Sequence, residues 1–153
     1  MILRYAQTTD AEAICSLINY YAERGLMLHR SMESAYSSLR EFQVADDDDR
    51  QVVGCVAVDI FWADLAEVRS LAVREDYRGK GIGRELVKAA VAEARGLGIA
   101  RIFTLTLEDD FFGRLDFSKV PKDSLPEKVW SDCVNCPKRD NCDEIAMVIG
   151  TGA

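Results

Sequence analysis

The feature that most constrains the fold is a glycine cluster between an apolar run and a long helical pattern. Three glycines fall within residues 79–83, shortly after an apolar run that ends at Val73. Residues 81–97 then carry apolar side chains at helical spacing, and residues 101–107 form a β-rich run. Strand, glycine turn, helix and strand predict one β-α-β unit with two parallel strands and a right-handed crossover.

The glycine turn itself has the properties of an anion-binding loop. Gly79, Gly81 and Gly83 let the backbone turn tightly with its N–H groups pointing one way, and the following helix adds the positive end of its dipole. The spacing matches neither the dinucleotide motif nor a P-loop. The alternative is a turn that only ends a strand. Three flanking cations make this alternative less favoured, namely Arg78, Lys80 and Arg84.

Length and charge limit the kind of protein and its partners. With 153 residues, of which 48% are hydrophobic, the chain is predicted to form a single domain over residues 1–153. A formal net charge of −7 argues against nucleic acid or an anionic membrane as partner. The first residues do not resemble a signal peptide, and no apolar run is long enough to span a membrane. We therefore expect a soluble, cytoplasmic protein.

The hydrophobic pattern predicts alternating strands and helices along the chain. Strands are expected at residues 2–7, 43–45, 51–61, 65–73, 101–107, 116–120 and 144–149, and helices at 10–25, 32–42, 81–97 and 108–115. Thr9 and Glu12 have the spacing of a capping box, and Ser31 is available to cap the second helix. Residues 121–143 hold all three prolines and three of the five cysteines, which indicates an irregular excursion before the last strand.

Charged residues at two places call for an explanation. Glu67 and Arg69 share one face of a central strand, whereas Val68 and Leu71 do not alternate regularly with them. Arg30 lies at a helix start, where the helix dipole disfavours a cation. This placement suggests a binding role for Arg30, with a solvated surface arginine as an equally weighted alternative.

Metal chemistry has little support in the sequence. The only histidine, His29, excludes a multi-histidine site and disfavours a nucleophilic triad. Three cysteines have metal-like spacing, but a tetrahedral zinc would need Asp143 or Cys55 as fourth ligand. Reduced structural cysteines are favoured over structural zinc, and zinc over a redox switch, for Cys133, Cys136 and Cys142.

The order β-α-α-β-β-β-α-β-α-β, with Arg78-x-x-Gly81-x-Gly83 opening the central helix, resembles the GCN5-related N-acetyltransferase (GNAT) family over nearly the whole chain. The resemblance implies an α/β (α+β) fold with a mixed sheet of about six to seven strands, a splayed parallel pair and flanking helices. It also implies acetyl-coenzyme A as co-substrate. The pantetheine arm would lie along Leu71, Ala72 and Val73, and the pyrophosphate on Arg78, Gly79, Lys80, Gly81, Ile82, Gly83 and Arg84.

A closer similarity is to the acetyltransferase domain of bacterial N-acetylglutamate synthases, in a short stand-alone form. It is carried by residues 25–31, 66–73, 103–106, 111–117, 125–128 and 133–137. It implies acetyl transfer to the α-amine of an amino acid, L-glutamate first, in arginine biosynthesis. Arg30 and Ser31 would hold the acceptor, Arg69 would supply a second carboxylate contact, and Ser70 is assigned to the same site. A homodimer is what such relatives often form.

The chemistry needs a base for the attacking amine, and Glu67 is the candidate. An ion pair with Arg69 is the alternative, and the resemblance favours the base role, through water. Many relatives carry a tyrosine acid where this chain has Phe112, which is assigned to the cofactor site. A thiol with a pKa near ~8.5 leaves with little help. Residues 107–110 also depart from the synthases, so three alternatives stay open: another small amine, a protein N-terminus, or a non-catalytic acyl-coenzyme A sensor.

Overall fold

The computed structural model describes residues 1–126 and 144–150. Two compact units are defined by the contacts within the chain. The first unit contains residues 1–59 and 68–93, and the second contains residues 60–67 and 94–153. The prediction of a single domain over the whole chain stays a prediction.

Helices and strands lie close to where the hydrophobic pattern predicts them. The strands are β1 (Ile2–Tyr5), β2 (Phe42–Asp46), β3 (Val52–Trp62), β4 (Leu65–Val73), β5 (Arg101–Thr106), β6 (Ser118–Lys119) and β7 (Ile145–Ile149). The α-helices are α1 (Ala11–Ala22), α2 (Met32–Ser37), α3 (Ile82–Gly96) and α4 (Asp109–Gly113), with short 3-10 helices η1 (Thr8–Asp10), η2 (Leu39–Glu41), η3 (Glu75–Tyr77) and η4 (Lys122–Ser124). A seven-stranded mixed sheet in the order β1-β2-β3-β4-β5-β7-β6 confirms the expected fold class.

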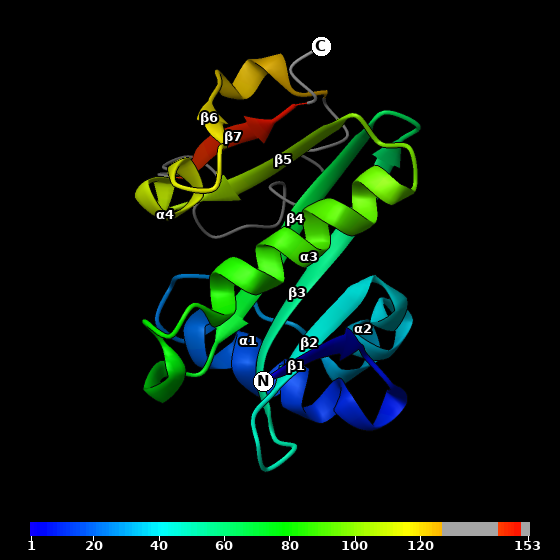
Figure 1. Cartoon of the computed structure of the whole chain (residues 1–153), viewed down its shortest axis with the longest axis vertical. Helices are drawn as coiled ribbons and strands as arrows, with labels where there is room; N and C mark the ends of the chain where they lie inside the picture. The colour runs from blue at the N-terminus through cyan, green and yellow to red at the C-terminus, as the bar shows by residue number, and fades with distance from the viewer. Residues whose placement is uncertain (127–143, 151–153) are drawn as a thin grey trace. The chain divides into compact units, whose positions relative to one another are not determined.

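In the first unit, β1, β2 and β3 form an antiparallel ladder (Figure 1). Leu3 pairs with Ala45, and Val44 pairs with Cys55. An irregularity between Ala45 and Asp46 shifts the register of β2 against β3. All five residues of β2 are buried, as expected for a strand covered on both faces.

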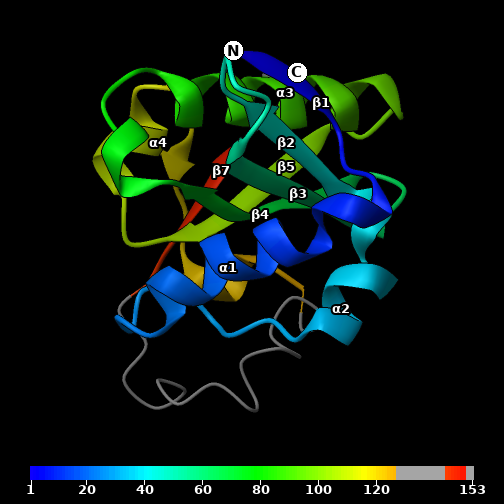
Figure 2. The same cartoon turned by 90° about the horizontal axis from the view of Figure 1, so that it is seen from below.

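Helices cover both faces of this ladder (Figure 2). α1 and α2 lie on one face, and α3 lies on the other. Side chains from α1 pack against β2 and β3 in a cluster of buried residues, which comprises Ile14, Leu17, Ile18, Tyr21, Phe42, Val44, Cys55, Ala57 and Ala72. Burial of this apolar surface is the main force that holds α1 to the sheet.

Gly54 explains how closely α3 approaches β3. A β-carbon at this position would lie 2.9 Å from Leu86 Cδ1 and 3.2 Å from Ile82 Cγ2. A side chain at this position would crowd both residues, so glycine allows the helix to pack this closely.

The second unit contains the parallel pair. Residues 65–67 of β4 pair with residues 101–103 of β5, so that Glu67 lies opposite Phe103. β7 pairs antiparallel with β5 on one side and with β6 on the other. The buried core cluster of the second unit comprises Leu65, Phe103, Leu125 and Ala146.

Two local predictions were wrong. The capping box expected from Thr9 and Glu12 at the start of α1 is absent, since α1 begins after Asp10 without a side-chain cap hydrogen bond. A capping box forms instead at η1, where the Gln7 N–H donates to the Asp10 carboxylate at 2.7 Å. The helix predicted over 32–42 ends at Ser37 and continues as η2, so that β2 begins at Phe42. The expected cap at Ser31 is confirmed, since its hydroxyl accepts a hydrogen bond from the Ser34 N–H at 3.0 Å.

Within residues 1–126 and 144–150, no helix combines the length and apolar character that crossing a membrane would require. Over the same ranges, no three His, Cys, Asp or Glu side chains gather as a metal site would need. Cys133, Cys136 and Cys142, and most of the predicted excursion, lie outside the described residues.

Candidate functional site

The glycine loop has the geometry of an anion site. Gly79 and Gly81 adopt left-handed backbone conformations, with φ of 79° and 84°. Side-chain-bearing residues rarely adopt these values, so the glycines are required here. The Glu85 N–H donates to the Gly81 carbonyl at 3.1 Å as the first turn of α3 closes. The amides of residues 82–84 therefore have no partner within the helix and are available to an anion.

Tyr77 supports this loop from the side. Its hydroxyl donates to the Asp47 carboxylate at 2.8 Å, which raises the pKa of Tyr77. Backbone hydrogen bonding from Gln51 and then the Tyr77 hydroxyl lower the pKa of Asp47. The Arg74 guanidinium and the Lys80 ammonium lie 5.2 and 4.9 Å from the centre of the Tyr77 ring. The turn of four aspartates thus holds the tyrosine beside two cations of the loop.

The last turn of α1 contacts the start of the same loop. The Tyr21 hydroxyl donates to the Val73 carbonyl, and the Tyr20 hydroxyl donates to the Glu75 carboxylate. The Arg78 guanidinium lies 5.9 Å from the centre of the Tyr21 ring. α1 therefore fixes the point where β4 ends and the glycine loop begins.

The predicted cofactor-arm residues lie on two faces of β4. Ala72 is buried and packs against the core under α1, whereas Leu71 and Val73 are half-buried on the opposite face. The alternation places Leu71 and Val73 together, as a wall beside an extended ligand would require. Their assignment to the cofactor stays a prediction.

β4 contains a backbone distortion at Ser70. Its φ is 56°, a left-handed conformation in the middle of a strand, which is unfavourable by roughly 1–2 kcal/mol for a residue with a side chain. The distortion explains why apolar and charged positions do not alternate regularly along this strand. The Cys55 thiol donates to the Ser70 carbonyl at 3.4 Å. Burial raises the pKa of Cys55 to about 12, so this thiol is a packing group rather than a nucleophile.

Arg30 is fixed by contacts from three elements. Its Nη1 donates to Ser34 Oγ at 3.0 Å, and its Nη2 donates to Ser70 Oγ at 3.1 Å. The guanidinium lies 5.0 Å from the centre of the Phe42 ring. Burial, and then the positive charge of Arg69, lower the pKa of Arg30. A cation held in this way would gain energy from a bound carboxylate.

Arg69 lies in the same charged cluster. Its Nη1 is 3.2 Å from an Asp59 carboxylate oxygen. Burial, and then the charge of Asp59, raise the pKa of Glu41, which Arg69 and Arg30 partly oppose. The structure thus brings together two arginines and two carboxylates in the first unit.

Two other predicted site residues, Glu67 and Phe112, belong to the second unit. Glu67 is 8% exposed, two residues before Arg69 on β4. Phe112 is 4% exposed on α4 and meets Phe111 and Phe117 edge-on, with ring centres 5.1 and 5.2 Å apart. The roles proposed for Glu67 and Phe112 stay predictions.

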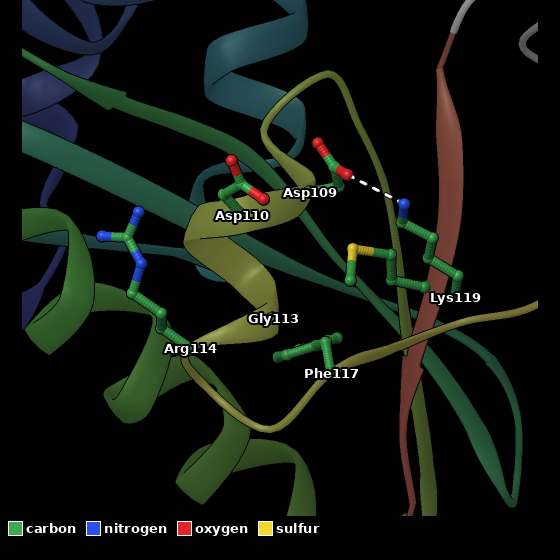
Figure 3. Close-up of a pocket in the computed structure, with 7 residues that line it drawn as sticks. Asp109, Asp110, Gly113, Arg114, Phe117 and Lys119 are labelled. Carbon is green, nitrogen blue, oxygen red and sulfur yellow. Dashed lines mark ion pairs between the residues drawn. The ribbon is translucent and has the colours of Figure 1, made fainter.

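The second unit also has an open surface cavity of about 430 Å³ (Figure 3). Asp109 and Lys119 point toward one another across it and form an ion pair at 3.0 Å. The cavity is lined by Asp109, Asp110, Gly113, Arg114, Phe117, Lys119 and Met147. None of the site residues expected from the sequence is among them.

Some contacting residues were missed by sequence reasoning. Asn19 and Tyr21 follow the helical pattern of α1, where tyrosine fits an apolar face and asparagine a solvated one. Asp47 lies in a run of aspartates that suggests only a solvated turn. The irregular alternation around Ser70 is the one sequence signal related to the distortion of β4, and by itself it does not identify the residue or its conformation.

Fold and loop together define a class: α/β proteins that hold a phosphate-bearing ligand at the turn of a β-α-β unit. More specifically, the chain belongs to the Acetyltransferase (GNAT) family, whose sequence profile matches residues 9–117. The expected family and fold are therefore confirmed.

Known relatives agree with this membership. An uncharacterized N-acetyltransferase of Chlorobaculum tepidum is 47% identical over 95% of this chain and 94% of its own length. An amino-acid acetyltransferase of Mycobacterium tuberculosis is 35% identical over 86% of this chain and 76% of its own. The N-acetylglutamate synthase of Neisseria gonorrhoeae, solved with coenzyme A and N-acetyl-glutamate, matches with a TM-score of 0.88 at 29% identity, over 99% of this chain and 35% of that one.

The protein is an N-acetyltransferase that uses acetyl-coenzyme A. The relatives support acetyl transfer to an amino acid. The unpaired amides of residues 82–84 and the flanking cations fit a pyrophosphate chemically, because both are suited to a multiply charged anion.

Proposed function

We propose that the chain transfers the acetyl group of acetyl-coenzyme A to the α-amine of L-glutamate, as a step of arginine biosynthesis. The observation that carries this proposal is the setting of Arg30. In the described part of the chain, its side-chain hydrogen bonds run to two neutral hydroxyls, those of Ser34 and Ser70. A partly buried guanidinium with neutral partners favours an added anion.

A dicarboxylate acceptor suits Arg30 and Arg69 better than a simple amine does. Arg30 offers a planar guanidinium to one carboxylate of the acceptor. Arg69 is near enough to Arg30 to lower the pKa of Arg30. A polyamine would bring further positive charge to two arginines, which is unfavourable. The relatives named above, an amino-acid acetyltransferase and an N-acetylglutamate synthase, support the same acceptor class.

The acetyl donor supplies a thioester, whose thiolate leaves with little assistance because of its low basicity. The remaining task of the chain is to remove a proton from the acceptor ammonium. We assign this task to Glu67, acting through water, because a buried carboxylate on the strand that leads to the loop can be tuned toward neutral pH. Leu71 and Val73 would flank the arm, and Phe112 would contact the donor without providing a proton.

A thiol-release assay against a panel of acceptors tests the function. The panel contains glutamate, glutamine, aspartate, other amino acids, a polyamine and a peptide with a free N-terminus. Release with glutamate at far lower concentration than with the others is the expected result. Release only with the polyamine or peptide would overturn the amino-acid acceptor. Binding of acetyl-coenzyme A without release in any arm would instead identify a sensor.

Glu67→Gln tests the base. We expect kcat at neutral pH to fall about 10²–10⁴-fold and the acid limb of the pH profile to move to higher pH, because the carboxylate base is gone. Raising the pH should restore part of the rate, since the amine then loses its proton to solvent. Steady-state kinetics from acid to alkaline pH measure both. An unchanged acid limb would assign the base to another group.

A further inference from the structure

Three consecutive residues near the end of α1 contact both halves of the proposed site within the first unit. Asn19 contacts the backbone of Arg30, while Tyr20 and Tyr21 contact residues around the start of the glycine loop. None of the three is among the site residues expected from the sequence.

The contact on the acceptor side is a matched pair of hydrogen bonds. Asn19 Nδ2 donates to the Arg30 carbonyl at 2.9 Å, and the Arg30 N–H donates to Asn19 Oδ1 at 2.8 Å. Arg30 lies in a segment without regular secondary structure between α1 and α2. One side chain therefore satisfies both backbone polar groups of a residue that has no helix or strand partner.

The contact on the donor side comes from Tyr21, two residues further along the helix. The Tyr21 hydroxyl donates to the carbonyl of Val73, the last residue of β4. Burial raises the pKa of Tyr21, so this hydroxyl keeps its proton and remains a donor at neutral pH.

We propose that Asn19 is a positioning residue for the acceptor and that Asn19 and Tyr21 make the end of α1 a common support for both substrates. A helix is stiff over two residues, so the Arg30 backbone and the end of β4 are both hydrogen-bonded to the same rigid element, α1. The distance from the acceptor arginine to the donor loop is thereby set without either residue touching a reacting atom. The acceptor's identity rests on the proposed function, whereas the support itself does not.

Asn19 can be shortened without opening a hole in the core. It lines an open surface cavity of about 410 Å³ together with Glu12, Cys15, Ser16, Tyr20, Glu23 and Met32. Asn19→Ala therefore removes two hydrogen bonds rather than buried packing. Ser16→Ala is the matched control, because Ser16 is exposed on the same helix and lines the same cavity.

The kinetic test compares these variants with Tyr21→Phe. Asn19→Ala should raise the acceptor KM about tenfold and leave the acetyl-coenzyme A KM within about twofold. Tyr21→Phe should raise the acetyl-coenzyme A KM by about fivefold and change the acceptor KM less. Ser16→Ala should match the parent. Equal changes of both KM values in Asn19→Ala, or none, would overturn the proposal.

A second measurement is independent of the acceptor. Phenylglyoxal modifies accessible arginines, and peptide mass spectrometry gives the rate at Arg30. Asn19→Ala should increase this rate several-fold, because the guanidinium is no longer held by a fixed backbone, while Ser16→Ala leaves it unchanged. If the parent acetylated no amino acid, the proposed function would be wrong. The modification rate at Arg30 would still test whether Asn19 holds the Arg30 backbone. An unaltered rate in Asn19→Ala would overturn it.

Discussion

Arg30 shows how strongly the site depends on the shape of one side chain. Its two terminal nitrogens are directed by Ser34 and Ser70, on different elements. Arg30→Lys keeps the charge and removes the fork. We expect the acceptor KM to rise about 10–100-fold, because a hydrogen bond to a charged group contributes about 1.5–3 kcal/mol. Initial-rate kinetics with the acceptor varied will measure this change.

The control for this substitution is Arg40→Lys, which alters an exposed arginine on η2 in the same way. Its acceptor KM should equal that of the parent. The acetyl-coenzyme A KM should stay within about twofold in both variants. An unchanged acceptor KM in Arg30→Lys would remove the assignment of Arg30.

Glu41 carries a pH-dependent term in stability. Burial, and then Asp59, raise its pKa, so the folded state binds this proton more tightly than the unfolded state. Stability from this group is present at acid pH and is lost as pH rises from about 4.5 through the raised pKa. Glu41→Gln should therefore stabilise the protein at pH 7 by roughly 0.5 kcal/mol after screening at this half-exposed site.

Denaturant titration at several pH values measures the effect of Glu41→Gln. The difference from the parent should shrink as the pH falls through about 4.5 and vanish well below it, where Glu41 is neutral in both states. A variant that is less stable than the parent at pH 7 would mean that attraction to Arg30 and Arg69 outweighs burial.

At the scale of elements, the turn between β2 and β3 supports η3 through one hydrogen bond. Tyr77→Phe removes the bond to Asp47 and leaves the ring between Arg74 and Lys80. We expect the acetyl-coenzyme A KM to rise about fivefold with the acceptor KM unchanged, since one hydrogen bond contributes about 1 kcal/mol. Kinetics with each substrate varied will separate the two values.

The double variant Tyr77→Phe with Asp47→Asn makes this test specific. If the bond is the cause, the double variant should be little worse than either single one. Tyr36→Phe, which removes an exposed hydroxyl on α2, is the control. Additive losses in the double variant would show that the residues act separately.

Elements were predictable from sequence where one local rule decides them. Helical spacing with a glycine turn before it identifies α3, and the β-rich run identifies β5, because period and turn chemistry agree. The left-handed Ser70 was not predictable, since serine has no preference for this conformation and Arg30 contacts it across 40 positions of chain. Asn19 was missed for the same reason: its partner is a backbone that only the fold brings near.

At the scale of the whole molecule, Arg4 joins three elements near the N-terminus. It makes a bidentate pair with Asp10 at 2.8 and 2.9 Å and contacts Asp46 through Nε at 2.8 Å. The two acidic side chains are 7% and 11% exposed. Arg4→Met leaves both carboxylates nearly buried and without their cationic partner, so we expect a loss of about 2–4 kcal/mol in the free energy of unfolding.

Acid titration of the parent and Arg4→Met tests the direction in which their difference in stability changes with pH. Hydrogen bonds from Arg4 lower the pKa of Asp10, so this stabilisation is present above pH 3.8 and is lost as pH falls through the depressed value. The gap between parent and variant in urea denaturation should therefore narrow in strong acid. A matched surface substitution, Arg101→Met, should leave stability within about 0.5 kcal/mol. A constant gap at all pH values would contradict the pairing.

If the first amides of α3 bind the pyrophosphate as proposed, donor affinity depends on Gly54, a residue that has no side chain. Leu86 could rotate its terminal methyl away from a new β-carbon, but Ile82 is branched at its own β-carbon and can yield only if the first turn of α3 moves. That turn carries the amides assigned to the pyrophosphate. Substitutions at this position would therefore change the affinity for the cofactor by a large step. A mutagenesis screen limited to residues that contact the ligand would not include Gly54.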